Sequence, residues 1–544
     1  MADRYWVGGS AIWDATAGTK WSTTSGGAGG ASVPTSADDV YIDAGSGAVT
    51  VTVTNAAANC RSLSFTSPAG PFTGTFAGPV QITIAGSLTL VAGMTRTFTG
   101  ALVFSATTAQ TITTAGISLD SGITFNGVGG SWVLQDNLTN GSTRTITFTN
   151  GSLDLNGKVL TTGVFNSTNT NARTLAFGSN GKIIVSNSGV TVWNTADVSN
   201  LTLTGSKNVE LSYSGSTGTR TITASSVNGT ESRVFNFSVT AGTDTVALGA
   251  GSRCLNFNLS AFSGTLANGA RTVFGSLTIG SATTLTAGTN ATTFATTGSQ
   301  TITSNGRTLD FPLTFDGVGG SWSLVDNLTI GATRTVTLTN GTLNANNRNV
   351  SLGVFALGVG TKTLTLGSGT WTVAGGTWNS NLNSAGLTVG ASTATISMTS
   401  ASAQTFAGGG FTWPTLNQGG AGALTIQQSN TFANITNTVQ PATITLTAGT
   451  TQTVSAFGVS GTSGNLITLN SSSSGSQATL SDSSGVNSVS FVSIKDIAAT
   501  GGATWNAFSS SGNVDAGNNS GWDFNDLAFR YIYNRRKNKV IFPF

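Results

Sequence analysis

Carboxylates are the side chains of this sequence that could carry out acid–base chemistry. The chain has no histidine and only two cysteines, Cys60 and Cys254, which removes imidazole as a base or ligand and every Cys/His zinc site. Two carboxyl groups about 5–10 Å apart would suffice for glycoside hydrolysis. The candidates for such a pair are Asp120, Asp136, Asp154, Asp310, Asp316, Asp326, Glu210 and Glu231.

Two of these carboxylates recur at matched positions, which favours a structural role over catalysis. Asp120 returns as Asp310, and Asp136 returns as Asp326, in a duplicated stretch of sequence. A turn that needs Asp to bond its own backbone would explain an aspartate present in both copies. Glu210 and Glu231 fall outside the duplication and are the better candidates if an active site exists. We predict that the chain is not an enzyme and has no catalytic residue.

Metal and cofactor sites are also not expected. Asp38, Asp39 and Asp43 could offer oxygen ligands to Ca²⁺, but no glycine–aspartate nonapeptide repeat accompanies them, and a structural capping role is favoured. The glycine-rich stretch 127–130 leads into no helical pattern and therefore lacks the context of a phosphate-binding loop. Cys60 and Cys254 are interpreted as small buried apolar residues.

A long block of the sequence occurs twice. Residues 125–151 return as residues 315–341 with a constant offset of 190, so that Trp132 matches Trp322 and Asp136 matches Asp326. Duplicated short strands joined by Asn-Gly turns are typical of repeat proteins built from stacked turns of strand. The duplicated tryptophans are therefore interpreted as structural, and features specific to function are expected where the repeat is broken.

The composition agrees with a β-rich repeat protein. Charged residues make up 8% of the 544 residues, against about a quarter in ordinary domains. The chain also has 72 glycines, 38% hydrophobic residues and a formal charge of +3, which is not the low-hydrophobicity, high-charge signature of disorder. A body this close to neutral does not favour nucleic-acid binding.

The pattern within the repeats predicts the fold. In residues 145–149 Ile146 and Phe148 alternate with threonines, and Asn150-Gly151 then indicates a turn. The β-hairpins of a β-sandwich would show the same pattern of alternating strands and Asn-Gly turns. Strands of three to five residues, the absence of a helical period and the duplication favour an all-β, right-handed parallel β-helix. Such a solenoid needs roughly 20–25 residues per turn, giving about 20 turns.

Aromatic residues gather at both ends of the repeats. Trp6, Trp13 and Trp21 precede the first turn, and Trp522 follows the last. An open solenoid end exposes a hydrophobic cross-section and an unpaired strand edge. We therefore predict aromatic N- and C-terminal caps; stacking of the N-terminal tryptophans on a sugar is the alternative.

The first 45 residues contain several recognisable stretches, namely residues 4–9 (RYWVGG), Trp13-Asp14, Lys20-Trp21, residues 26–30 (GGAGG) and residues 33–40 (VPTSADDV). This opening resembles the start of many β-helical phage virion proteins. It is more loosely similar to bacterial β-helical adhesins and autotransporter passengers. The stretch Ser520-Gly521-Trp522-Asp523-Phe524 resembles the closing turns of the same families. The resemblance implies a tail fibre, tailspike-like appendage or capsid fibre, and a homotrimer.

The last residues differ abruptly from the repeats. Five of the 23 basic residues and none of the 20 acidic ones follow Asp526. A folded-back cap with solvent-facing cations is one interpretation; a docking tail for an acidic or apolar partner, such as another virion protein, is the second; phosphate binding is the third. The docking residues would be Arg530, Arg535, Arg536, Lys537, Lys539, Phe542 and Phe544.

These observations predict five segments: an N-terminal cap or attachment segment (1–45), a first β-helix block (46–250), a duplicated block (251–380), looser turns with a closing cap (381–525) and a basic, aromatic tail (526–544). No secretory signal or membrane span is visible, so we expect assembly in a host cytoplasm and a place in a virion. The expected function is a structural phage protein that contacts other virion proteins or a host surface glycan. A bacterial adhesin and a polysaccharide depolymerase are the alternatives.

Overall fold

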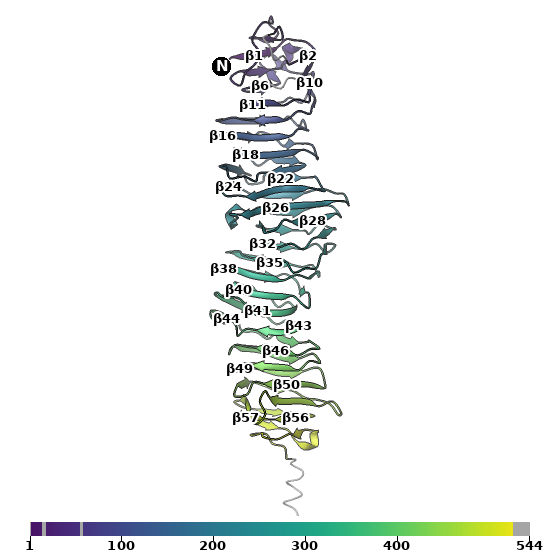
Figure 1. Cartoon of the computed structure of the whole chain (residues 1–544), viewed down its shortest axis with the longest axis vertical. Coiled ribbons are helices and arrows are strands. Elements are labelled where there is room, and N and C mark those ends of the chain that lie inside the picture. The colour runs from purple at the N-terminus through teal and green to yellow at the C-terminus, as the bar shows by residue number, and fades with distance from the viewer. Residues whose placement is uncertain (1, 14–17, 55–57, 526–544) are drawn as a thin grey trace, which may run out of the picture. The chain divides into compact units, whose positions relative to one another are not determined.

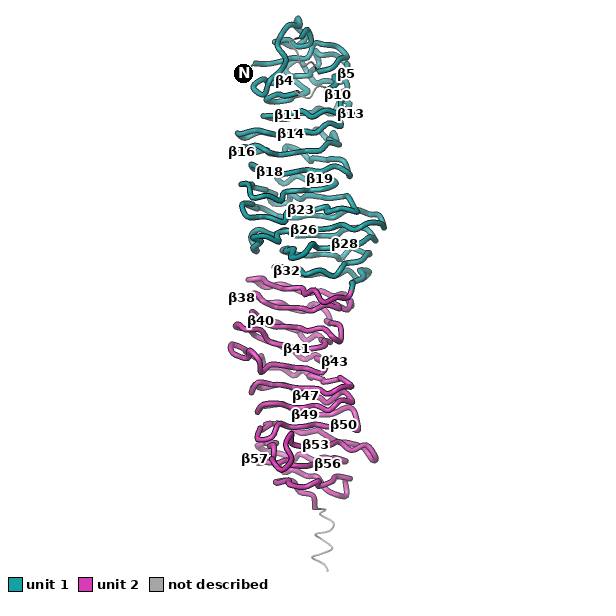
Figure 2. Tube along the Cα trace, viewed as in Figure 1, with its two compact units in different colours: residues 1–286 teal, residues 287–544 magenta. Residues whose placement is uncertain are grey.

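The protein is a parallel β-solenoid of about 22 turns, seen in a computed structural model that describes residues 2–13, 18–54 and 58–525 (Figure 1). Within these residues the helical elements are three single 3₁₀ turns, η1 (Ala44–Ser46), η2 (Glu231–Arg233) and η3 (Ser509–Ser511). None of the described helices has the length and hydropathy needed to cross a bilayer. The chain divides into two compact units, Met1–Thr286 and Ala287–Phe544 (Figure 2).

In the first unit most strands pair in parallel with the strand one coil later. Strand β11 (Ile82–Ile84) pairs with β14 (Leu102–Phe104), and β14 pairs with β16 (Ile123–Leu134). Ile82 lies beside Leu102, and Leu102 beside Ile123, so these coils are 20 and 21 residues long. Because side chains alternate across a strand, the apolar positions of these coils point into a shared core. The predicted parallel β-helix is confirmed.

The length of a coil varies more than expected. Phe165 in β20 (Val164–Asn166) pairs with Trp193 in β23 (Thr191–Asp197), and Trp193 pairs with Ile222 in β26 (Thr219–Val227). These two coils contain 28 and 29 residues, beyond the predicted 20–25. The pairing of β23 with β26 also shifts register between Thr191 and Trp193 and again between Thr195 and Asp197, so the ladder is irregular in this coil. The coil is widest in the stretch that separates the duplicated blocks.

The duplicated blocks form two copies of one aromatic stack. In the first unit the rings of Phe104 and Phe125 stack with centroids 5.0 Å apart, and Trp132 lies 5.1 Å from Phe125. In the second unit Phe294, Phe315 and Trp322 repeat this arrangement at 5.1 and 5.2 Å. Both tryptophans are fully buried. Offset and tilted rings add favourable contact to the area that they bury.

The strands of the duplicated blocks are longer than predicted. Strand β16 has 12 residues, as does its counterpart β38 (Leu313–Leu324), and β18 (Thr145–Asp154) has ten. Asn150-Gly151 lies inside β18 and is not the turn that the sequence suggested; Gly151 bends the strand with φ +88° while the ladder continues. A parallel coil needs only such a bend at its corner, since its chain does not reverse.

Aromatic residues fill the two ends of the described chain. Trp6, Trp13 and Trp21 are buried and pack edge to face, with centroids 5.1 and 4.9 Å apart. Here β1 (Asp3–Trp6) pairs antiparallel with β3 (Trp21–Ser22) and parallel with β4 (Asp39–Tyr41). In the second unit Trp522 lies 5.2 Å from Trp505. The predicted tail, residues 526–544, lies outside the described residues.

Candidate functional site

The duplicated aspartates hold neighbouring coils together. Asp136 accepts hydrogen bonds from the backbone N–H of Thr114 at 2.9 Å and of Ala115 at 2.5 Å. Its counterpart Asp326 accepts from the backbone N–H of Ser304 at 2.9 Å and from its hydroxyl at 3.1 Å. In both copies the aspartate therefore accepts hydrogen bonds from residues of the preceding coil. The expectation that these aspartates bond their own backbone is wrong, because a coil stack places the earlier turn directly beside them.

A second duplicated aspartate pairs with an arginine of the following coil. The Nε atom of Arg144 donates to Asp120 at 2.9 Å, and Arg334 donates to Asp310 at 2.7 Å. The hydrogen bond from Arg144 lowers the pKa of Asp120 below its ordinary value. A carboxyl held ionised in this way is a poor general acid at neutral pH.

The two remaining aspartates of the candidate set also have structural partners. Asp154 accepts from the backbone N–H of Asn156 at 2.7 Å, which is the local turn bond expected for an aspartate. Asp316 accepts from the side-chain amide of Asn340 at 2.7 Å, in the next coil.

The glutamates occupy the wide coils of the first unit. Glu210 in β25 (Asn208–Leu211) accepts from Lys182 Nζ at 2.7 Å and from the Thr240 hydroxyl at 3.1 Å. Glu231 begins η2, in the loop before β27 (Asn236–Val239). A lysine and a hydroxyl therefore surround Glu210, and the structure places the two glutamates on different elements.

The N-terminal aspartates each serve a separate contact. Asp38 accepts from the backbone N–H and the hydroxyl of Thr35, at 3.0 and 2.7 Å, and Asp39 pairs with Arg61. Asp43 precedes η1 and accepts from the Ser67 hydroxyl at 2.6 Å. Their oxygens therefore bond three different parts of the cap segment.

Buried cations were missed by the sequence analysis. Arg173 in β21 (Arg173–Ala176) and Lys362 in β42 (Lys362–Thr365) point inward, with exposed fractions of 2% and 1%. Lys362 Nζ donates to the carbonyls of Gly358, Gly360 and Ala385 at 2.7, 2.8 and 3.2 Å. Arg173 likewise donates to Asn169 and to the Asp197 carbonyl. Each cation thus fastens the loops at one corner.

A sequence signal for these cations exists. Each cation is the first residue of a strand and stands two positions before a buried leucine, as in Arg173-Thr174-Leu175 and Lys362-Thr363-Leu364. Because side chains two positions apart lie on the same face of a strand, this spacing places the cation on the buried face. Arg220-Thr221-Ile222 shows the same two-residue spacing. Its guanidinium and the carboxylate of Asp244 are fully buried and joined by two hydrogen bonds of 2.9 and 2.6 Å.

Shallow recesses lie beside the same corner in both units. In the first unit a recess of about 290 Å³ is lined by Gly129, Gly130, Gly151, Ser152 and Arg173, among others. In the second, a recess of about 390 Å³ is lined by the equivalent Gly319, Gly320, Gly341, Thr342 and Lys362 with their neighbours. Backbone, hydroxyls and the stems of buried cations form these walls, and neither lining includes a carboxylate.

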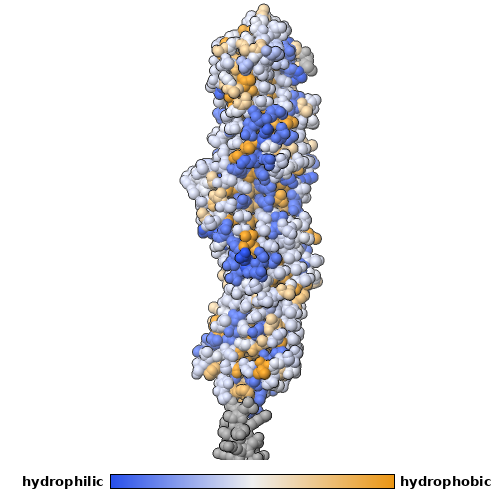
Figure 3. Space-filling model, turned by 180° about the vertical axis from the view of Figure 1, so that it is seen from behind, coloured by the Kyte–Doolittle hydropathy of each residue, from blue (hydrophilic) through white to orange (hydrophobic). Residues whose placement is uncertain are grey.

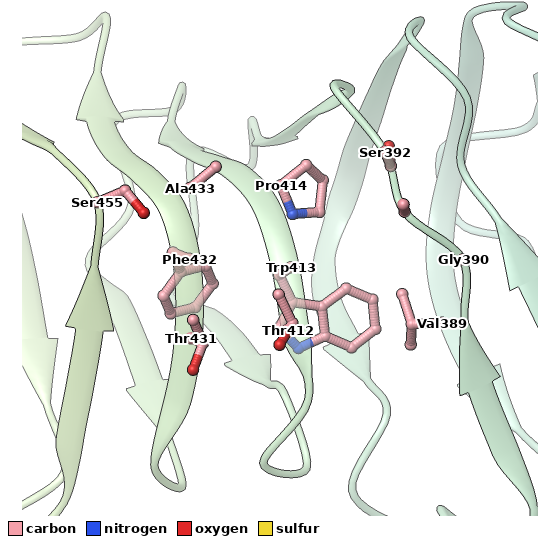
Figure 4. Close-up of a pocket in the computed structure, with 11 residues that line it drawn as sticks. Val389, Gly390, Ser392, Thr412, Trp413, Pro414, Thr431, Phe432, Ala433 and Ser455 are labelled. Atoms are coloured by element: carbon pink, nitrogen blue, oxygen red, sulfur yellow. The ribbon is translucent and has the colours of Figure 1, made fainter.

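A further recess of about 290 Å³ opens on the second unit. Strands β47 (Thr412–Gln418) and β49 (Asn430–Asn437) form its floor, with Pro414 and Ala433 at its surface and the loop at Ser392 along one side (Figure 4). Trp413 lies beneath and donates its indole N–H to the Gly408 carbonyl at 3.1 Å. This lining contains no titratable group.

Comparison of the chain with protein-family models, with curated proteins and with solved structures gives no match.

Proposed function

We propose that this protein is a structural component of a bacteriophage virion: a β-solenoid fibre, appendage or decoration protein that contacts other virion proteins or the host surface. The role is non-catalytic. The observation that carries the proposal concerns the first 45 residues, whose sequence resembles the opening of phage β-helical proteins. Their tryptophans form a buried aromatic cluster where the coils begin.

The use of the carboxylates supports a non-catalytic role. Asp136 and Asp326 bind backbone amides, Asp120 and Asp310 pair with arginines, and Glu210 pairs with Lys182. Glycoside hydrolysis requires one carboxyl that keeps a proton near neutral pH and a second that stays ionised. The hydrogen bond from Arg144 lowers the pKa of Asp120, and the side-chain oxygens of the other four accept hydrogen bonds from structural partners.

The surface supports a scaffold or contact role. The outward positions of the coils are mostly threonine, serine, asparagine and glycine, and the face seen in Figure 3 is largely neutral in hydropathy, with scattered polar and apolar patches. Such a surface suits uncharged contacts with protein or glycan.

The proposal is tested by locating the chain in purified particles. Particles banded on a density gradient should contain the chain at a fixed copy number relative to the major capsid protein, measured by quantitative peptide mass spectrometry. The chain should also follow the particles through a second purification. Recovery of the chain only in the particle-free lysate would contradict the proposal.

A separate assay addresses the enzymatic alternative. Incubation with host capsular polysaccharide and lipopolysaccharide should release no new reducing ends. Release that disappears in the Glu210→Gln variant and persists in Asp120→Asn would instead establish a depolymerase. An adhesin would be indicated if antibodies labelled the chain on uninfected bacterial cells.

A further inference from the structure

A fully buried ion pair lies among the wide coils of the first unit. Arg220 is the second residue of β26, and Asp244 directly precedes β28 (Thr245–Leu248). Both side chains have an exposed fraction of 0%, whereas the arginines of the duplicated ion pairs, Arg144 and Arg334, keep 35% and 20% exposed. Because desolvation offsets much of the attraction within a buried pair, net stability is a weak explanation for it.

Four loops stack at one corner of these coils. On one side of the corner β22 (Lys182–Val185) pairs in parallel with β25, and β25 with β27. On the other side β23 pairs with β26, and β26 with β28. The ladders continue into β30 (Phe257–Asn258) and β31 (Thr265–Leu266). The loops that join the two sides therefore follow one another in successive coils. We call them the corner loops, first to fourth: residues 186–190, 212–218, 240–244 and 259–264.

The guanidinium of Arg220 binds two of the corner loops. Its Nε and Nη2 atoms donate to the two carboxylate oxygens of Asp244 at 2.9 and 2.6 Å. Nη2 also donates to the Ala241 carbonyl at 2.8 Å, and Nη1 donates to the Leu211 carbonyl at 3.2 Å. One side chain thus holds the third corner loop at two points and fixes the residue directly before the second.

The remaining corner loops also contact the pair. In the first loop, Oγ of Ser188 lies 3.3 Å from the Asp244 carboxylate and 2.8 Å from the Thr217 carbonyl. Tyr213 of the second loop and Phe262 of the fourth place their ring centroids 5.7 and 5.4 Å from the guanidinium carbon. A cation and an aromatic ring attract each other at such distances. The ion pair therefore touches all four corner loops.

The sequences of the corner loops do not themselves favour one conformation. The second loop reads Ser-Tyr-Ser-Gly-Ser-Thr-Gly, a composition close to that of flexible linkers. In the third loop Gly242 has φ +100°, and a Cβ there would lie 2.6 Å from Nη2 of Arg220 and 2.7 Å from Oδ1 of Asp244. The third loop thus leaves out a side chain where the ion pair needs the space.

An apolar pair would fill the same space without holding the loops. Arg220 and Asp244 stand two positions before the buried Ile222 and Val246, so apolar side chains in their places would extend the core. Replacing a buried ion pair by packed apolar residues is often neutral or stabilising, whereas removing one partner leaves an uncompensated charge. What the ion pair adds is direction, because its hydrogen bonds fix where the bonded carbonyls lie.

We propose that the Arg220–Asp244 pair is a conformational latch, which holds the four corner loops in one arrangement and contributes little net stability to the coils. The inference concerns the isolated protein and does not depend on a place in a virion. The backbone N–H of Thr243 reports the latched arrangement, since it joins the third loop to the second by donating to the Gly215 carbonyl at 3.0 Å.

The test is hydrogen exchange of the full chain, measured by mass spectrometry. In the double variant Arg220→Met and Asp244→Leu, peptides covering residues 212–218 and 240–244 should exchange about tenfold or more faster than in the wild type, through local opening. Strands β26 and β28 should keep their protection, and the thermal midpoint should stay near that of the wild type. Asp244→Leu alone should lower the midpoint more than the double variant does, because it leaves the guanidinium buried and unpaired.

The matched control is Arg334→Met with Asp310→Leu, which removes a partly exposed pair that also joins neighbouring coils. This control should leave exchange at the corner loops unchanged. The latch would be overturned if these loops exchanged equally fast in the wild type and the double variant. It would also be overturned if β26 and β28 lost protection together with the loops, or if the double variant were less stable than Asp244→Leu alone.

Discussion

At the scale of single residues, glycines set how closely successive coils approach. Gly317 and Gly319 lie two positions apart and provide a matched pair. Gly317→Ala would bring a Cβ within 2.0 Å of the Thr296 carbonyl oxygen, whereas Gly319→Ala would meet no atom within 4 Å and only impose φ +77° on an alanine.

We expect Gly319→Ala to lower the free energy of unfolding by about 1–2 kcal/mol, the cost of a left-handed residue. Gly317→Ala should cost more, because the backbone must move. The loss of unfolding free energy in each variant is measured from the midpoint of its denaturant unfolding curve. Equal midpoints, or a larger loss for Gly319→Ala, would show that close coil packing does not constrain this bend.

The cysteines allow a second residue-scale prediction. Both are buried, and burial raises the pKa of the Cys60 thiol and raises that of Cys254 to about 12. The reactive thiolate is therefore scarce at pH 8. A thiol reagent should label neither cysteine in the native protein and both in denaturant. Rapid labelling of the native chain would contradict the packing described for these coils.

At the scale of elements, buried cations fasten the loops at the coil corners. Lys362→Met would leave the carbonyls of Gly358, Gly360 and Ala385 without their donor, at a cost of about 1–3 kcal/mol for each carbonyl that stays buried and unpaired.

Lys182→Met is the control, since Lys182 is partly exposed and loses only its pairing with Glu210, typically less than about 1 kcal/mol. Thermal unfolding should show a clear loss for the first variant and little change for the second. Hydrogen exchange should further place the loss at residues 358–361 and 380–386. A greater loss for Lys182→Met would refute the anchoring role of Lys362.

Sequence alternation predicted much of each element but not its partners. Ile146 and Phe148 are buried as their spacing indicates, because a two-residue period alone decides which face of a strand is apolar. The partners of Asp136 lie about one coil upstream, and coil length varies widely along the chain. To predict a contact between two coils, one must know which residues of successive coils lie side by side. The alternation within a single strand does not give that pairing.

At the scale of the whole molecule, repetition made the fold predictable. The duplication at an offset of 190 residues, the scarcity of charge and the terminal tryptophans together indicated a capped parallel solenoid, and the parallel solenoid is confirmed. The duplication likewise indicated that the Gly-Val-Gly-Gly-Ser-Trp block is structural. In the structure Gly127 and Gly130 lie against the Ala106 carbonyl of the preceding coil, and the Trp132 ring lies 6.4 Å from that of Phe104. The exposed Val128 and Val318 were not singled out, because alternation does not distinguish a bulge from a strand.

The central claim is that this chain is a structural part of a phage particle, and electron cryomicroscopy of the purified particle tests it most directly. We predict density layered at about 4.8 Å into which each unit fits, with the aromatic clusters resolved as bulky side chains. A particle whose density is fully assigned to other proteins, with this chain absent, would contradict the account.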